Sequence, residues 1–400
     1  MNILFRISLR YLTSRSFFSF ISFSVILSIL ALIISVASLI IITSFSSGFS
    51  KLVNSKLSDL DGHLRIHSYI DKTIQISEFN RVSNKIKDYS LAPFIENNVI
   101  INNNKKNVIF HLYGISKYSL KEIFNLDKYS LNKNYFENDN SIIVGKKIAN
   151  DLDISLNDTL IMTNINNLFL NGKIFAKKFI VSDIFETHFP EYDKQLAFIK
   201  FKTAQEFFDM ENKCNGFILN VKDPLHINND IDLLDRVLDN EPYYIISWKE
   251  RHKLLLEWLL IYDAPIKIVM IFISVIAIIN IGSSLWLIFI DKIKNYAIMK
   301  AYGLSKRKIS LIILIQGLYI GIIGVVLGAL FSFIILYFEN QYHFIKIPDD
   351  IYFTNYLPVS IELYNFIFFP MIALLATLIL SIIPAYYSSK KDLFEKLKYE

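Results

Sequence analysis

Residues 16–50 read SFFSFISFSVILSILALIISVASLIIITSFSSGFS and carry no charged side chain. A helix that crosses the hydrocarbon core of a bilayer needs about 20 mostly apolar residues, so this run is long enough to cross. It follows a basic stretch with Arg6, Arg10 and Arg15, and no small-residue cleavage site precedes the next polar segment. We therefore predict a retained transmembrane helix here and no cleaved signal peptide.

Three further runs without charge lie at 268–290, 309–338 and 363–389. The 400 residues are 53% hydrophobic, and the mean hydropathy is +0.37. A soluble enzyme, a secreted disulfide scaffold and a disordered chain are excluded as descriptions of the whole chain, and Cys214 as the single cysteine forms no internal disulfide;. The predicted segments are an N-terminal amphipathic elbow at 1–16, transmembrane helices at 17–46, 266–290, 309–338 and 364–388, a large domain at 47–265, loops at 291–308 and 339–363, and a tail at 389–400.

Basic residues flank the spans unevenly. They gather in the N-terminal stub, the 291–308 loop and the C-terminal tail, whereas the 339–363 loop holds more acids than bases. Because cytoplasmic loops are enriched in Lys and Arg, we expect both termini and the 291–308 loop in the cytoplasm, and the 47–265 domain and the 339–363 loop on the outer side of the membrane. The net charge of +5 is a topology signal and requires no nucleic-acid partner.

The 47–265 domain mixes short strands and helices, which predicts an α+β fold. Its strand-like runs are His63–Tyr69, Val108–Ile115, Thr159–Met162, Phe175–Val181, Leu196–Phe201 and Phe217–Val221, and its helix-like runs are Glu78–Tyr89, Lys146–Leu152, Thr203–Asp209 and Ile231–Leu238.

Residues 164–178 hold a strong hairpin signal. Leu168, Phe169 and Leu170 precede Asn171 and Gly172, and a second apolar run follows;. The apolar tip is either a docking surface or part of an ordinary buried hairpin.

A helix is expected from Ser247, because Glu250 stands three residues later at capping-box spacing. It would run through Pro265 into the second span, as a rod that transmits motion or as a plain spacer.

The chain lacks the sequence signatures of catalysis. No Gly-x-x-x-x-Gly-Lys-Ser/Thr phosphate loop and no Gly-x-Ser-x-Gly elbow occurs;. His63 and His67 lie four apart on a predicted strand, which is a poor metal-site spacing. We expect no catalytic residue, no metal and no cofactor bound by this chain. The uncharged runs also lack the acidic and basic relay of a proton- or ion-coupled carrier.

The third span carries glycines at spacings of four, three and four, which place them on one helix face. Such small residues allow two helices to approach closely. Gln316 precedes this ladder, and Asn280 in the second span is expected to make an interhelical hydrogen bond. The predicted packing residues are Asn280, Gln316, Gly317, Gly321, Gly324 and Gly328.

The 291–308 loop contains a short helix-like run that ends at a predicted glycine stop, Gly303. Tyr296 and Met299, with Ile293 and Tyr302, are expected on one side of this helix. The helix either rests on the membrane surface or forms a knob for a soluble partner.

These motifs together resemble the permease subunits of lipoprotein-releasing ABC transporters, the LolC/LolE family within the FtsX/MacB-type superfamily. The resemblance runs over essentially the whole chain. In the loop helix, Asn295 replaces the usual acid. The other matching motifs are Arg10-Tyr11-Leu12-x-Ser14-Arg15, Ser47-Gly48-Phe49, Ala92-Pro93-Phe94, Asn280-Ile281 before Ser283-Ser284-Leu285, the Gln316-Gly317 ladder, Pro348-x-x-x-Tyr352-Phe353, Leu357-Pro358-Val359, Pro384-Ala385 and Leu397-Lys398-Tyr399-Glu400.

The resemblance implies a MacB-like periplasmic core between the first two helices. It implies a LolD-like cytoplasmic ATPase dimer that binds ATP and Mg²⁺, a second permease subunit, a lipoprotein substrate drawn from the membrane lipids, and a LolA-like periplasmic carrier. The implied sites are the ATPase coupling helix (Tyr296, Ala297, Ile298, Met299, Lys300, Ala301 and Gly303), a cavity entrance at Ser47, Gly48 and Phe49, and a carrier-binding hairpin at Leu168–Gly172.

Other functions remain open at this point. The chain could be an FtsX-like transmitter that activates a wall hydrolase, a MacB-like efflux permease, or a membrane-anchored binding domain. The sequence does not decide between a LolC-type, a LolE-type and a homodimeric permease.

Overall fold

The computed structural model describes residues 20–390 except 88, 104–105, 165–175 and 349–351. The chain divides into a helical unit of residues 1–49, 259–345 and 357–400 and a mixed unit of residues 50–258 and 346–356.

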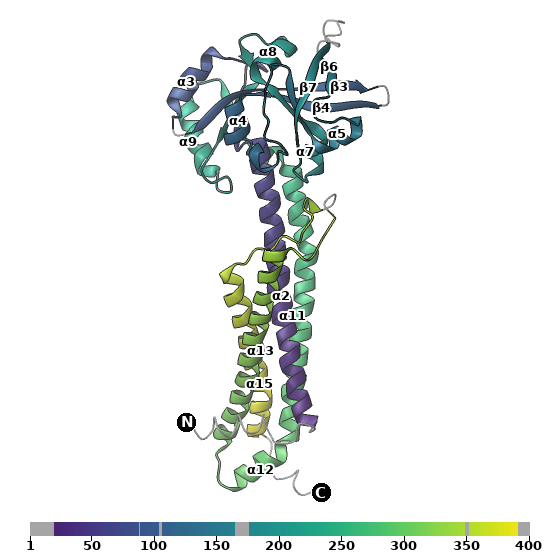
Figure 1. Cartoon of the computed structure of the whole chain (residues 1–400). Coiled ribbons are helices and arrows are strands. Elements are labelled where there is room, and N and C mark those ends of the chain that lie inside the picture. The colour runs from purple at the N-terminus through teal and green to yellow at the C-terminus, as the bar shows by residue number, and fades with distance from the viewer. Residues whose placement is uncertain (1–19, 88, 104–105, 165–175, 349–351, 391–400) are drawn as a thin grey trace. The chain divides into compact units, whose positions relative to one another are not determined.

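Four helices of the described chain are long and apolar enough to cross a membrane. They are α2 (Phe20–Asp61), α11 (Lys253–Asp291), α13 (Lys306–Tyr342) and α15 (Leu363–Lys390), and the short helix α12 (Ile293–Ala301) joins α11 to α13. Figure 1 shows the four long helices running side by side within the helical unit. The predicted membrane protein with four spanning helices is confirmed.

Helix α2 continues well past residue 46, where the first span was expected to end. The continuation carries Val53, Leu57 and Leu60, each at most 1% exposed. Spacings of four and three place these side chains on one helix face, so an amphipathic helix follows the apolar one without a break. Helix α11 begins at Lys253, before the second span, as expected of a helix that runs through Pro265 into that span.

The core of the helical unit is formed by branched aliphatic side chains of α2, α11 and α13. Partly buried residues of α15, among them Ala373 and Leu374, pack against it. Its buried members are Val25, Leu32, Val36, Ile40, Ile281, Leu285, Ile288, Ile320, Val325 and Leu336.

The mixed unit is built on a nine-stranded sheet with the order β11-β1-β10-β3-β4-β8-β5-β7-β6. Strand β6 also pairs with β3. The strands β3, β4, β8, β5, β7 and β6 therefore form a closed ring of paired strands. The strands are β1 (Leu64–Ser68), β3 (Ser90–Asn103), β4 (Lys106–Ile115), β5 (Ser141–Gly145), β6 (Thr159–Asn164), β7 (Ala176–Phe185), β8 (Leu196–Lys200), β10 (Gly216–Asn220) and β11 (Tyr243–Ser247), with a separate pair β2 (Ile74–Gln75) and β9 (Lys213–Cys214).

Short helices lie between the strands, which confirms the predicted α+β class (Figure 1). They are α3 (Ser77–Lys85), α4 (Lys117–Glu122), the 3₁₀ turn η1 (Leu126–Lys128), α5 (Lys146–Leu152), α7 (Pro190–Gln195), α8 (Phe201–Phe208), α9 (Asn228–Leu238) and α10 (Trp248–Arg251).

Every strand-like and helix-like run of the sequence falls on an element of that type. The prediction missed the strands β2, β3, β5, β9 and β11 and the short helices α4 and α7. All five residues of β5 are buried, so this strand shows no alternation of polar and apolar side chains;. The predicted hairpin has its two arms in antiparallel β6 and β7, where Thr163 faces Ala176. Its tip, including Leu168–Gly172, lies outside the described residues.

Candidate functional site

Helix α12 packs through one face on α11 and α13. Tyr296 and Ala297 are at most 1% exposed, and the Tyr296 hydroxyl donates a hydrogen bond of 2.9 Å to Gln316 Oε1 on α13. The Tyr296 ring stacks on Phe289 of α11 with centroids 6.2 Å apart. The apolar cluster at this seat consists of Phe289, Tyr296, Ala297, Ile309, Ile312, Ile313 and Ala385.

The opposite face of α12 is open. Ile298 is 47% exposed and Tyr302 is 86% exposed, and Ala301 and Gly303 are exposed as well. The expectation that Tyr296 and Tyr302 share one side of the helix is therefore wrong, because six residues of helix turn the second side chain to the far side. Of the predicted coupling residues, Tyr296 and Ala297 hold the helix in place, and Ile298, Ala301 and Gly303 are accessible.

Gly303 ends α12 as expected. Its φ is +89°, its N–H donates to Lys300 O at 3.0 Å, and the next N–H, of Leu304, donates to Met299 O at 3.1 Å. This bond pair is the Schellman motif, in which glycine is favoured because its position is left-handed. A Cβ at Gly303 would meet nothing within 4 Å, so the requirement is conformational.

The glycine ladder of α13 contacts two different helices. A Cβ at Gly317 would lie 2.7 Å from Ser381 Cβ, and one at Gly321 would lie 2.5 Å from Thr377 Oγ1, both on α15. A Cβ at Gly324 would instead lie 2.9 Å from Leu32 Cβ, and one at Gly328 would lie 3.0 Å from Ile33 O, both on α2. The ladder therefore fixes α13 between α15 and α2.

Gln316 is 2% exposed and joins this packing. Asn280 is exposed on α11, and its interhelical hydrogen bond stays a prediction.

The three residues predicted to form a cavity entrance are packed closed. A Cβ at Gly48 would lie 2.4 Å from Pro358 O, and Phe49 is 4% exposed with its ring 5.9 Å from that of Tyr262. The Ser47 hydroxyl donates to the carbonyl of Thr43 in its own helix. These three residues make packing contacts in the structure, and their role as a cavity entrance stays a prediction.

One more contact joins α2 and α11 beside these residues: the Ser46 hydroxyl donates to Asp263 Oδ1 at 2.8 Å. Together with the ring contact between Phe49 and Tyr262, it holds the two helices together at this level.

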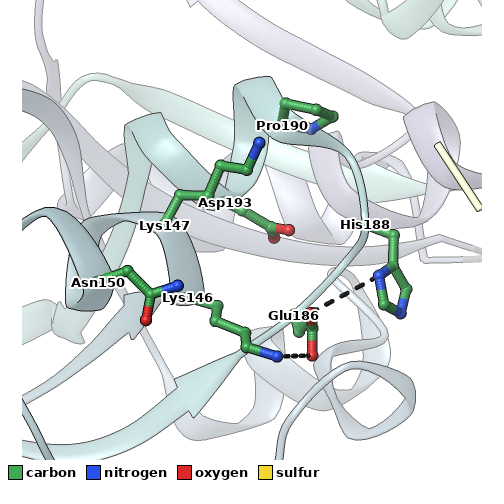
Figure 2. A pocket seen from close by; sticks show the side chains of 7 residues that line it. All are labelled: Lys146, Lys147, Asn150, Glu186, His188, Pro190 and Asp193. Atoms are coloured by element: carbon green, nitrogen blue, oxygen red, sulfur yellow. Dashed lines mark hydrogen bonds and ion pairs between the residues drawn. The ribbon is translucent and has the colours of Figure 1, made fainter. Parts of the chain in front are cut away.

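The mixed unit contains a polar pocket, shown in Figure 2. Lys146 Nζ lies 2.6 Å from Glu186 Oε2, and His188 Nδ1 lies 3.7 Å from Glu186 Oε1. Asp193 accepts hydrogen bonds from the Thr187 amide and hydroxyl at 2.8 and 2.7 Å, and burial raises the pKa of its carboxyl. The charges of Lys146 and Glu186 are thus paired with each other, whereas Asp193 is bonded to the neutral Thr187.

Within the described parts of the chain, no group of three His, Cys, Asp or Glu side chains could hold a metal ion. His63 and His67 bond to backbone groups of Val221 and Asn215 instead.

Two family models match the chain. The model of the MacB-like periplasmic core domain matches residues 25–233, and that of the FtsX-like permease C-terminal region matches residues 267–393. The chain therefore belongs to the family of membrane permeases that carry a MacB-like periplasmic core domain.

Within that family the resemblance to LolC/LolE proteins is confirmed. The chain is 27% identical to the lipoprotein-releasing system transmembrane protein LolC of Buchnera aphidicola subsp. Schizaphis graminum, with 96% of each chain covered. It is 24% identical to LolC of Neisseria meningitidis serogroup B, with 98% of each chain covered. It is 23% identical to LolE of Haemophilus influenzae, again with 98% of each covered.

Proposed function

We propose that this chain is the permease subunit of an ABC transporter that extracts lipoproteins from the inner membrane and passes them to a periplasmic carrier. The observation that carries the proposal is the nearly full-length match to lipoprotein-releasing transmembrane proteins. The match covers all four apolar helices and the domain between the first two. The chain therefore shares the whole architecture of these proteins and not only one domain.

The seated helix α12 is the proposed contact with a separate, LolD-like ATPase dimer. Its buried face is fixed by Tyr296 and Ala297, and its open face presents Ile298, Ala301 and Tyr302. A helix held on one side can transmit a push from a soluble partner to α13. In this account ATP and Mg²⁺ bind to the partner, and this chain is not itself an enzyme.

Energetics support an ATP-driven step. Each acyl CH₂ group leaving the bilayer costs on the order of 0.8 kcal/mol, so an anchor of two or three chains does not leave unaided. The spans carry long uncharged runs, which suit acyl chains and suit ions poorly;.

From the positive-inside pattern we infer that both termini and α12 lie in the cytoplasm and the MacB-like core in the periplasm. Acyl chains would enter between the outer halves of the first two spans, where Ser47–Phe49 must part from their present packing. The hairpin between β6 and β7 is the proposed contact for a LolA-like carrier, and a second permease subunit completes the transporter.

Two variants test the coupling. Ala301→Asp places a charge on the open face, and Gly303→Pro removes the N–H that closes the helix. Both should stop release of a lipoprotein from spheroplasts to added carrier while the permease remains in the membrane. Lys306→Ala, an exposed change just beyond the helix, is the control. Normal release by both variants would overturn the coupling role of α12.

An FtsX-like signal transmitter is the alternative, because the family model that matches residues 267–393 is named for that class. A transmitter would co-purify with a cell-wall hydrolase and would leave lipoproteins in the membrane.

A further inference from the structure

A buried carboxylate ends the first spanning helix. Asp61 is the last residue of α2 and is 3% exposed. Its Oδ1 atom lies 2.6 Å from Arg65 Nη2 and 2.7 Å from Arg251 Nη1, and its Oδ2 atom lies 3.0 Å from His252 Nε2. One carboxylate thus engages three basic side chains.

The position of this acid is unfavourable by itself. The C-terminal end of a helix carries partial negative charge, which repels a carboxylate. Burying an ion also costs several kcal/mol, and apolar residues of similar size are often at least as stabilising. Stability alone therefore does not explain an acid here, whereas a role in fixing the geometry of its partners does.

The partners come from the two ends of the mixed unit. Arg65 lies on β1, which directly follows α2, and Arg251 and His252 lie at the junction of α10 and α11. Strands β1 and β11 pair antiparallel, with Leu64 facing Ser247. The Ser247 capping box then starts α10, which brings Arg251 back to the end of α2.

Further contacts fix the Arg65 side chain of this cluster. Arg65 is 2% exposed, and its Nη1 lies 2.6 Å from Glu96 Oε2. Its guanidinium group also lies over the rings of Phe94 and Tyr113, 4.9 and 5.4 Å from their centroids. The two arginines balance the carboxylates of Asp61 and Glu96. Burial alone would raise the pKa of Glu96, and the two guanidinium groups outweigh burial and lower it.

His252 extends the cluster to a further element. Its Nε2 atom, which faces Asp61, also lies 2.9 Å from the hydroxyl of Tyr192 on α7. The carboxylate therefore sits between the end of α2, the start of α11 and the body of the mixed unit.

We propose that Asp61 is a positioning residue that locks the end of α2 to the start of α11, so that movement of these two helices drives the periplasmic domain as one piece. The lock rests on the proposed function, since it matters only if ATP-driven motion of the spans does work in that domain. In this proposal Asp61, Arg251 and His252 couple ATP hydrolysis to lipoprotein release.

The test uses the whole transporter, purified with its co-purifying ATPase and reconstituted with a triacylated lipoprotein in proteoliposomes. Asp61→Asn should keep ATP hydrolysis and lower the lipoprotein released per ATP by about fivefold or more, the lower end of typical coupling between sites. His252→Gln breaks the lock without leaving an arginine unpaired and should shift the same ratio in the same direction. Arg81→Ala, which removes exposed ion pairs with Glu78 and Glu241, is the matched control.

The outcomes separate the two claims. A wild-type complex that hydrolyses ATP and releases no lipoprotein would refute the proposed function. Wild-type release with an unchanged ratio in Asp61→Asn and His252→Gln would overturn the lock. Loss of hydrolysis and release in equal proportion would also overturn the lock, because it would show that the cluster only supports the folded structure. If Asp61→Asn does not assemble, the ratio in His252→Gln decides.

Discussion

The hydroxyl of Tyr296 on α12 donates a hydrogen bond of 2.9 Å to the side-chain oxygen of Gln316 on α13. Both residues are at most 2% exposed. Gln316 immediately precedes Gly317, the first glycine of the ladder that packs α13 on α15. A displacement of α12 is therefore passed to α13 through a buried polar contact.

Tyr296→Phe should destabilise this seat. The change removes the hydroxyl and leaves the Gln316 oxygen buried without its donor, a loss of about 1–3 kcal/mol. Thermal unfolding of the detergent-solubilised protein should show a lower midpoint, whereas Tyr302→Phe, at an 86% exposed site, should leave the midpoint unchanged. Equal midpoints for the two variants would mean that the hydrogen bond does not hold α12.

The glycine ladder predicts a sharp contrast between two Gly→Ala changes. In Gly321→Ala the new methyl group would stand 2.5 Å from Thr377 Oγ1, so α13 and α15 must separate. Overpacking of this kind costs about 1–3 kcal/mol. In Gly282→Ala on α11 the nearest contact is 3.6 Å, an ordinary van der Waals distance, and stability should not fall. Similar unfolding midpoints for both variants would contradict the tight seam.

Gly48→Ala should loosen the loop that covers α2. Its methyl group would lie 2.4 Å from Pro358 O and would push away the segment in which Ser360 N–H donates to Ser44 O. Hydrogen exchange at the Ser360 amide should become faster. The neighbouring Ser47→Ala removes a hydroxyl that donates to the Thr43 carbonyl of its own helix, and this variant should exchange as the wild type does. Unchanged exchange in Gly48→Ala would show that the loop does not depend on this close approach.

The mixed unit should lose stability in mild acid through His63. This imidazole is 7% exposed and accepts a hydrogen bond of 2.9 Å from the Val221 amide, and burial lowers its pKa. As the pH falls below about 6.5 the unfolded chain takes up the proton first. Stability therefore declines from there down to the folded-state pKa and then levels off.

His63→Asn should flatten this decline. The measurement is the unfolding midpoint between pH 8 and pH 5, with His226→Asn at an 82% exposed side chain as the control. A steeper decline in His63→Asn than in the wild type would reverse the sign and contradict the assignment.

The spanning helices were predictable because each carries a long uncharged run, which is a matter of composition alone. The end of α2 was not, because beyond Gly48 the chain changes from an apolar to an amphipathic helix while remaining helical. A change in hydropathy marks where the chain leaves the membrane. It does not mark where the helix ends, because α2 continues past that point. In the domain, β5 was missed because all five of its residues are buried.

The site was predictable to different degrees. The glycine spacing identified a packing face, and Gly303 identified the end of α12, because both signals are local. Which partner each glycine meets is set by tertiary packing, and so is the burial of Tyr296. Asp61 was missed: Arg65 stands four residues away, but Arg251 and His252 reach the carboxylate only through the pairing of β1 with β11.

The most direct test of the central claim is a native mass spectrum of the tagged protein purified in mild detergent from its own cells. The account predicts a complex of two permease chains with two copies of a small ATPase, carrying an acylated protein. A spectrum without any ATPase, or with an ATPase and a cell-wall hydrolase in place of an acylated protein, would contradict it.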